Sequence, residues 1–245
     1  MKLLIDAGNS QLKFALSDAV IWCDLPPLAT GQVDQVSAHL QRCSELDSAR
    51  VTAVWASNVA GESVAVQLRK MVAAYDVPLH FIQARSAQCG VRNGYENPVQ
   101  LGSDRWAMLL AARAICQVDC LVVSCGTATT IDALSAQGEF LGGLILPGLD
   151  LLRSSLQAAT AQLRNTAGSY AKFPRNTADA IYTGALQATL GALLQQYAAL
   201  QNGAAQVILT GGAAGTLQAQ LEQPVQRVNN LVLQGIARIA QENSK

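Results

Sequence analysis

The sequence predicts an α/β protein built from two similar halves, residues 1–117 and 118–245, each of which begins with a strand-turn-strand hairpin. Apolar strands alternate with helices along the chain, and this alternation is typical of layered α/β folds. The apolar-turn-apolar pattern of Met1 to Phe14 returns at Leu121 to Leu134, with a glycine at the same place in both turns. This repetition indicates an internal duplication. Two such halves predict a nucleotide in a cleft between them.

The composition indicates a compact globular protein. Half of the 245 residues are hydrophobic and only 14% are charged, the formal net charge is zero and the sequence pI is about 6.7. Because no basic patch stands out, nucleic acid is not an expected partner. Asp6 interrupts the first apolar run too early for a signal peptide. The longest apolar region, Trp106 to Ala133, is broken by polar residues, so we expect no membrane span.

The cysteines and histidines argue against a zinc site. None of the six cysteines forms a Cys-x-x-Cys pair, and the chain has only two histidines. Since no secretion signal is expected, the thiols should be reduced and should serve as small apolar side chains in a cytoplasmic protein.

The turn of the first hairpin carries groups that suit a phosphate. Its glycine lets backbone N–H groups approach an anion, and Lys13 supplies positive charge. Asp6 would repel a bare phosphate, so we expect a hydrated Mg²⁺ between the two. Short segments of this kind are common in proteins, and either hairpin taken alone is more often unrelated to phosphate binding.

The rest of the pattern predicts several further elements. A third strand is expected at Val20 to Trp22, followed by a proline-rich loop at Asp24 to Gly31. A helix is expected from Glu62 to Tyr75, because its apolar residues recur with helical spacing. The stretch from Arg85 to Gln100 is rich in glycine and asparagine and should form no regular element. Long irregular loops inside compact domains are often functional.

Two expected helix starts carry candidate site residues. Ser103 is the expected N-cap of a helix that has Asp104 and Arg105 in its first turn. The helix dipole alone also explains an acidic residue there, and from this segment alone that simpler explanation is favoured. Thr177 is the expected cap of a long helix that runs to about Leu200. Small residues crowd this helix, which suits either a dimer interface or burial inside the monomer.

Two common nucleotide-binding motifs are absent from the sequence. The chain has no Gly-x-x-x-x-Gly-Lys-Ser/Thr, which excludes a Walker-type ATPase, and no Gly-x-Gly-x-x-Gly followed by an acidic residue, so a dinucleotide-binding fold has no support. Paired hairpins with a late Gly-Gly turn instead resemble the superfamily of acetate and sugar kinases, heat-shock ATPases and actin. This resemblance implies two halves of ribonuclease H-like (actin-like ATPase) architecture.

Within this superfamily, the sequence resembles the type III pantothenate kinases. Five family motifs occur in the family's order and at similar spacing over essentially the whole chain: Asp6 to Lys13, Gly102 to Arg105, Gly126 to Asp132, Gly142 to Gly148 and Gly211-Gly212. Each motif alone is a weak signal. Together they are specific, because independent chance matches would also have to fall in the right order.

The resemblance implies transfer of the γ-phosphate of ATP to the primary hydroxyl of pantothenate, the first step of coenzyme A synthesis. It also implies a homodimer, with Asp104 as the general base and Asp6 holding Mg²⁺ through water. The implied ATP-binding residues are Asp6, Ala7, Gly8, Asn9, Ser10, Gln11, Leu12, Lys13, Gly126, Thr127, Gly211 and Gly212. The implied pantothenate-binding residues are Tyr95, Gly102, Ser103, Asp104, Arg105 and Thr177.

One position departs from the family pattern, and two other functions stay open. Most relatives carry aspartate in place of Ser124, and that acid helps to bind the K⁺ or NH₄⁺ that the reaction requires. We therefore expect Ser124 to form a weaker monovalent-cation site. The alternatives are a non-catalytic ATP-binding regulatory protein, which would not need Asp104, and a kinase or phosphatase acting on a sugar or acyl phosphate. The presence of Asp104-Arg105 together with Tyr95 argues against both.

Overall fold

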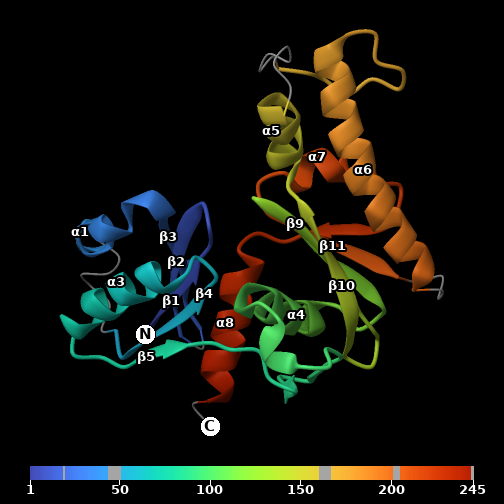
Figure 1. Ribbon diagram of the computed structural model, residues 1–245. Helices are drawn as coiled ribbons and strands as arrows, with labels where there is room; N and C mark the ends of the chain where they lie inside the picture. The colour runs from blue at the N-terminus through green and yellow to red at the C-terminus, as the bar shows by residue number, and fades with distance from the viewer. Residues whose placement is uncertain (19, 44–50, 160–166, 201–204, 244–245) are drawn as a thin grey trace. The chain divides into compact units, whose positions relative to one another are not determined.

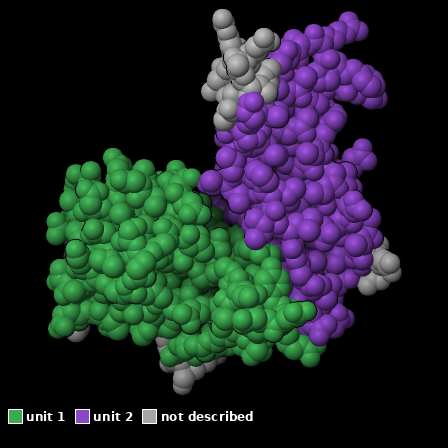
Figure 2. All heavy atoms as spheres, viewed as in Figure 1, with its two compact units in different colours: residues 1–115, 230–245 green, residues 116–229 purple. Residues whose placement is uncertain are grey.

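The computed structural model describes residues 1–18, 20–43, 51–159, 167–200 and 205–243. The chain divides into two compact units, coloured separately in Figure 2: unit 1 contains residues 1–115 and 230–245, and unit 2 contains residues 116–229. The halves expected from the sequence assign the last helix to the second half, whereas the structure assigns it to unit 1.

Unit 1 is built on a five-stranded sheet of order β3-β2-β1-β4-β5 (Figure 1). Strand β1 pairs antiparallel with β2 and parallel with β4, and β4 pairs parallel with β5. The carboxyl ends of β1, β4 and β5 therefore share one edge of the sheet, which is where open α/β sheets bind ligands. The elements of unit 1 are β1 (Lys2–Ala7), β2 (Gln11–Ser17), β3 (Trp22–Ala29), η1 (Thr30–Gln35), α1 (Val36–Gln41), β4 (Ala53–Asn58), α3 (Glu62–Ala73), β5 (Leu79–Phe81), β6 (Ala87–Gln88), β7 (Val91–Asn93), η2 (Pro98–Gln100), α4 (Ser103–Ile115) and α8 (Leu231–Glu242).

Within unit 2 the sheet order is β12-β11-β8-β9-β10. Strand β8 pairs antiparallel with β9 and parallel with β11. Strand β10 pairs antiparallel with β9, and β12 pairs parallel with β11. This order and these directions repeat those of unit 1, so the internal duplication predicted from the two hairpins is confirmed. The elements of unit 2 are β8 (Cys120–Cys125), β9 (Ala128–Leu134), β10 (Glu139–Pro147), α5 (Leu149–Ala159), α6 (Thr177–Ala199), β11 (Gln206–Thr210), α7 (Ala214–Gln218) and β12 (Val225–Arg227).

Each sheet buries an apolar face against helices. In unit 1, Ile5 and Phe14 pack in one buried cluster with Leu68 of α3. Helix α8 packs against α4, and this close approach requires Gly235, because a Cβ there would lie 1.9 Å from the carbonyl oxygen of Ala107. In unit 2, the equivalent strands pack against α6. The described helices include none with the length and apolarity that crossing a membrane requires.

The predicted loop from Asp24 to Gly31 is wrong, because β3 continues through Pro26 and Pro27 to Ala29. Strand β3 lies at the edge of its sheet, and among the described strands it pairs only with β2. A proline lacks the N–H that a central strand needs, but an edge strand has one unpaired side and tolerates it.

The stretch from Arg85 to Gln100 is also more regular than its composition predicts. It contains the antiparallel hairpin β6–β7 and the short helix η2. Cys89 and Gly90 form the two-residue turn, with φ angles of 47° and 79°. Positive φ at both central positions is typical of the two-residue turns that match the twist of the strands they join.

Two predicted helix caps are displaced by one residue. Helix α4 begins at Ser103 itself, and the carbonyl of Gly102 accepts its first intrahelical bond, so Gly102 occupies the capping position. Helix α6 begins at Thr177, but the cap is Asn176, whose side chain accepts a hydrogen bond from the backbone of Asp179 at 2.9 Å. The predicted extent of α6 is confirmed to within one residue of Leu200.

Candidate active site

The turn between β1 and β2 is held in a fixed conformation. The N–H of Gly8 donates to the carbonyl of Gln11 at 3.0 Å. Thr30 fastens the turn from outside: its Oγ1 donates to the carbonyl of Gly8 at 2.7 Å and its N–H to the carbonyl of Ser10 at 3.0 Å. The side chains of Asn9 and Ser10 remain exposed. The turn can therefore meet a phosphate without first being ordered, which favours binding.

Asp6 is a buried carboxylate at the end of β1, directly opposite Lys13 on β2. Burial raises the pKa of Asp6 to about 7, the charge of Lys13 opposes this shift, and the charge of Asp104 adds to it. No hydrogen bond to the Asp6 carboxylate occurs among the described residues. A buried anion in this state is stabilised by a cation, so the position fits Mg²⁺.

The surroundings of Asp6 also indicate how such an ion would be held. No group of three or more histidine, cysteine, aspartate or glutamate side chains suited to a metal is present in the described part of the chain. Mg²⁺ usually keeps several waters and uses one or two carboxylates together with substrate phosphates. A single carboxylate beside a turn that suits a phosphate matches this mode of Mg²⁺ binding.

Asp104 lies in the first turn of α4, where it is partly buried. Its Oδ1 accepts a hydrogen bond from the N–H of Arg105 at 2.8 Å, which turns the carboxylate back over the start of the helix. Burial raises the pKa of Asp104, whereas this bond and the charge of Arg105 oppose the shift. Gly102 provides the space, since a Cβ there would lie 2.7 Å from Asp104 Oδ1. A carboxylate with a raised pKa is a stronger proton acceptor at neutral pH.

Arg105 and Tyr95, which were both predicted as site residues, form a pair. Arg105 is only 4% exposed, and its Nη1 donates to Tyr95 Oη at 3.0 Å. The guanidinium carbon also lies 5.7 Å from the centre of the Tyr95 ring. The backbone of Tyr95 is fixed in turn by a 3.0 Å bond to the side chain of Asn93. The Tyr95 segment, which precedes α4, is thereby bonded to Arg105, the residue after the candidate base Asp104.

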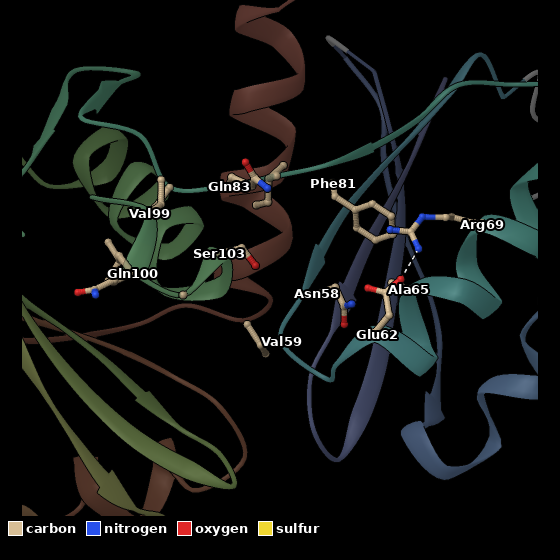
Figure 3. A pocket seen from close by; sticks show the side chains of 14 residues that line it. Asn58, Val59, Glu62, Ala65, Arg69, Phe81, Gln83, Val99, Gln100 and Ser103 are labelled. Carbon is tan, nitrogen blue, oxygen red and sulfur yellow. Dashed lines mark hydrogen bonds and ion pairs between the residues drawn. The ribbon is translucent and has the colours of Figure 1, made fainter. Parts of the chain in front are cut away.

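A cavity of about 690 Å³ lies beside Gly102 and Ser103 within unit 1 (Figure 3). It is formed at the carboxyl ends of β4 and β5 and at the starts of α3 and α4. On one wall, the guanidinium of Arg69 stacks on the Phe81 ring at 5.3 Å and bonds to Glu62 at 2.6 Å. The lining mixes apolar and polar groups, which suits a small polar organic molecule.

Ser57 is a further candidate site residue, which no motif indicates. It is completely buried at the carboxyl end of β4, where it is the registered neighbour of Asp6 on β1. Its Oγ lies 2.8 Å from the Oγ of Ser103. The one signal in the sequence is its position at the end of an apolar strand, because parallel strands gather ligand-binding residues at their carboxyl ends.

In unit 2, the exposed turn after β8 is packed by two glycines. The N–H of Gly148 donates to the carbonyl of Thr127 at 2.9 Å, and a Cβ on Gly148 would lie 2.1 Å from the carbonyl oxygen of Gly126. Gly211 has a φ of 95°, and a Cβ there would lie 2.5 Å from the carbonyl oxygen of Cys125. The motifs that contain Gly126, Gly148 and Gly211 therefore meet around the turn after β8. A side chain at Gly148 or Gly211 would displace this turn.

Ser124 lies at the centre of a row of three hydroxyl residues. Its registered partners are Thr130 on β9 and Thr210 on β11. Thr130 Oγ1 is buried and has no hydrogen-bond partner among the described residues. An unpaired buried oxygen beside Ser124 fits a role as a cation ligand, although no side chain of this row carries a charge. Thr177, the remaining candidate in unit 2, is exposed at the start of α6.

The groups that unit 1 assembles are those that phosphoryl transfer needs. A carboxylate suited to Mg²⁺ and a lysine lie at the turn between β1 and β2, and the charge of a second carboxylate, Asp104, adds to the raised pKa of the first. Phosphoryl transfer depends on alignment and charge neutralisation more than on covalent chemistry.

Comparisons with known proteins agree with this assignment. Residues 2–199 match the family model of type III pantothenate kinases. A type III pantothenate kinase of Aromatoleum aromaticum is 41% identical over 253 residues, which covers 100% of this chain and 99% of that protein. Among solved structures, a putative Baf family transcriptional activator from Campylobacter jejuni matches with a TM-score of 0.65 and 24% identity, covering 99% of this chain and 98% of that one.

A second solved structure, a Bacteroides thetaiotaomicron protein with an actin-like ATPase fold, matches with a TM-score of 0.52 and 10% identity, covering 96% of this chain and 95% of that one. At these identities the two structures show the fold alone, and they confirm the predicted actin-like ATPase architecture. The family model and the full-length relative go further. They show that the chain belongs to the type III pantothenate kinase family.

Proposed function

We propose that the protein is an ATP-dependent pantothenate kinase, which transfers the γ-phosphate of ATP to the primary hydroxyl of pantothenate in the first step of coenzyme A synthesis. The observation that carries the proposal is the pair of carboxylates, Asp6 at the end of β1 and Asp104 in the first turn of α4. Ser57 connects their two elements, because it is the registered neighbour of Asp6 and bonds to Ser103, the residue before Asp104. One carboxylate suits a cation and the other a general base. A non-catalytic regulator would have no use for the second, and nothing favours a sugar or acyl phosphate as substrate.

We base the proposed roles on the family resemblance together with the placement of Asp6 and Asp104. Asp104 accepts the proton of the attacking hydroxyl, and Asp6 holds Mg²⁺ through water. When bound, this ion neutralises charge on the phosphates. The remaining groups bind the substrates: phosphate at Gly8, Asn9, Ser10, Lys13, Gly126 and Thr127, adenosine at Gly211 and Gly212, and pantothenate at Tyr95, Arg105 and Thr177. We also place the reaction in the cytoplasm, because none of the six cysteines, all of which lie in the described part of the chain, forms a disulfide.

A direct assay tests the function. Purified protein is incubated with ATP, Mg²⁺ and pantothenate, and both ADP and the phosphorylated product are measured. We expect the two products in equal amounts, and no ADP above background when pantothenate is omitted. ATP hydrolysis that does not depend on pantothenate, or no turnover at all, would contradict the proposal.

The Arg105→Ala variant should raise the KM for pantothenate about 10- to 100-fold and change the KM for ATP much less. The reason is that a guanidinium provides a charge-assisted hydrogen bond to the anionic substrate, and such bonds are stronger than neutral ones. Steady-state kinetics with each substrate varied in turn provide the measurement. Arg113→Ala, near the other end of α4, is the matched control. A defect confined to ATP would reverse the placement of Arg105.

The Ser124→Asp variant should lower the K⁺ concentration that half-activates the enzyme. We propose that K⁺ or NH₄⁺ activates this kinase but binds weakly, because the neutral hydroxyls of Ser124 and Thr130 provide no charge. A carboxylate 4 Å from the ion would add at most about 4 kcal/mol at an effective dielectric constant of about 20, before desolvation. KCl is titrated at constant ionic strength into both proteins. An unchanged K⁺ response in the variant, or full wild-type activity in Na⁺ alone, would exclude Ser124 from a cation site.

The protein should be a homodimer in solution, and α6 is the proposed interface. This helix carries apolar residues around its whole circumference, although only one side of it packs in the unit 2 core. Gly184 and Gly191 on its exposed side have open space where a Cβ would lie, although glycine costs a helix about 1 kcal/mol relative to alanine. Sedimentation should show a dimer at micromolar concentration, and Ala188→Arg should weaken it. A fully active monomer would contradict the proposal.

A further inference from the structure

Ser57 and Ser103 share a single hydrogen bond between two hydroxyl groups, with their Oγ atoms 2.8 Å apart. The distance alone allows either hydroxyl to be the donor. The burial of Ser57 decides the direction. Ser57 is 0% exposed, and in the described part of the chain its hydroxyl has no other partner. If Ser57 accepted the bond, its own proton would be buried without an acceptor, which is the costlier arrangement. Ser57 is therefore the donor.

Ser103 is then the acceptor, and it keeps its own proton. Unlike Ser57, it is partly exposed, and it lines the cavity beside the start of α4 (Figure 3). The described residues provide no acceptor for the Ser103 proton. Because Ser57 occupies a lone pair of the Ser103 oxygen, the hydroxyl cannot turn its proton toward Ser57. The Ser103 hydroxyl can therefore donate its proton to an acceptor that enters the cavity. Ser103 directly precedes Asp104 in the chain, so this acceptor would lie near the candidate base.

Ser57 forms no hydrogen bond with Asp6 among the described residues, although the two lie side by side. The two residues are registered neighbours on the parallel strands β1 and β4. Side chains at registered positions lie on the same face of a sheet, so a bond between them would be within reach. No such bond forms among the described residues, and the Ser57 hydroxyl is directed to α4 instead.

We infer that Ser57 is a positioning residue of this kinase: it donates to Ser103 and so holds the Ser103 hydroxyl as a hydrogen-bond donor to an oxygen of the substrate bound beside Asp104. The inference rests on the proposed function, because pantothenate supplies that oxygen from one of its hydroxyl, amide or carboxylate groups. Ser103 touches the substrate, whereas Ser57 acts only through Ser103.

The test is a double-mutant cycle of Ser57→Ala and Ser103→Ala, in which the KM values for pantothenate and for ATP are measured. Ser103→Ala should raise the KM for pantothenate about 3- to 10-fold, the loss that one neutral hydrogen bond provides. Ser57→Ala should raise it in the same direction by a smaller factor, and the double variant should be no worse than Ser103→Ala. The KM for ATP should stay within about twofold. Ser57→Cys, which keeps the shape of the side chain but replaces the hydroxyl with a slightly larger thiol that is a weak donor, should reproduce Ser57→Ala and serves if the alanine variant does not fold.

Ser17→Ala is the matched control, because Ser17 is another buried serine of the same sheet whose hydroxyl bonds elsewhere, to the carbonyl of Asp18. It should leave both KM values unchanged, and thermal unfolding of every variant reports any loss of fold. If wild type phosphorylates pantothenate but the effects of Ser57→Ala and Ser103→Ala multiply, or if both substrates are affected equally, this inference is overturned and the proposed function stands. If wild type does not phosphorylate pantothenate, both are overturned.

Discussion

The Asp104→Asn variant should lose about 10²- to 10⁴-fold in kcat for pantothenate phosphorylation and keep its fold, since that is the usual loss when a general base is removed. Asparagine retains the oxygen that accepts the N–H of Arg105 at 2.8 Å, so the first turn of α4 should persist. The substitution removes only the proton acceptor. Because burial raises the pKa of Asp104, the wild-type carboxylate is a better base than an exposed one, and its activity should fall as the pH is lowered through that raised pKa.

Asp150→Asn provides the control for this experiment. Asp150 also lies in the first turn of a helix, α5, but its side chain is exposed and its partner is Arg153 at 3.2 Å. The control should leave kcat unchanged, and both variants should unfold thermally close to wild type. A kcat near the wild-type value for Asp104→Asn would mean that another group takes the proton.

The sequence predicts the fold well wherever the signal is local. Both hairpins are short apolar strands around a turn with glycine, and the structure has them at β1–β2 and β8–β9. The repetition of that pattern is enough to predict two units with the same sheet order. Long-range packing could not be predicted in this way. Strand β3 holds two prolines because it is an edge strand, and α8 belongs to unit 1 because Gly235 allows it to contact α4.

In the candidate site, too, local signals could be predicted from the sequence, whereas contacts between distant residues could not. The motifs predict Asp6, Asp104 and Arg105 as site residues, because these residue types suit phosphoryl transfer. The displaced caps have a physical cause. The Ser103 oxygen is hydrogen-bonded to Ser57 instead of accepting a bond from the backbone of α4, and asparagine, the residue type at position 176, is among the best helix caps. Ser57 itself lies 46 positions before Ser103, so only the folded chain brings them together.

The second large effect is expected at Gly102, where the Gly102→Ala variant should lose about 10²-fold in kcat with little change in thermal stability. An added Cβ would lie 2.7 Å from Asp104 Oδ1, which is too close for a contact between carbon and oxygen. The backbone at Gly102 has no positive φ, so alanine is not strained there, and the flexible end of Asp104 is what must move. A displacement of about 1 Å in a catalytic group is enough for a loss of that size.

Two comparisons decide whether the loss at Gly102 acts through Asp104. Gly31→Ala, at a glycine with no heavy atom within 4 Å of the added Cβ and no positive φ, should behave as wild type in kcat and thermal unfolding. In the Asp104→Asn background, Gly102→Ala should cost almost nothing further, because the group that it displaces no longer accepts a proton, and effects that act through one group are not additive. A full additional loss in that background would instead assign Gly102 a role of its own in substrate binding, and the KM for pantothenate would then rise in the single variant.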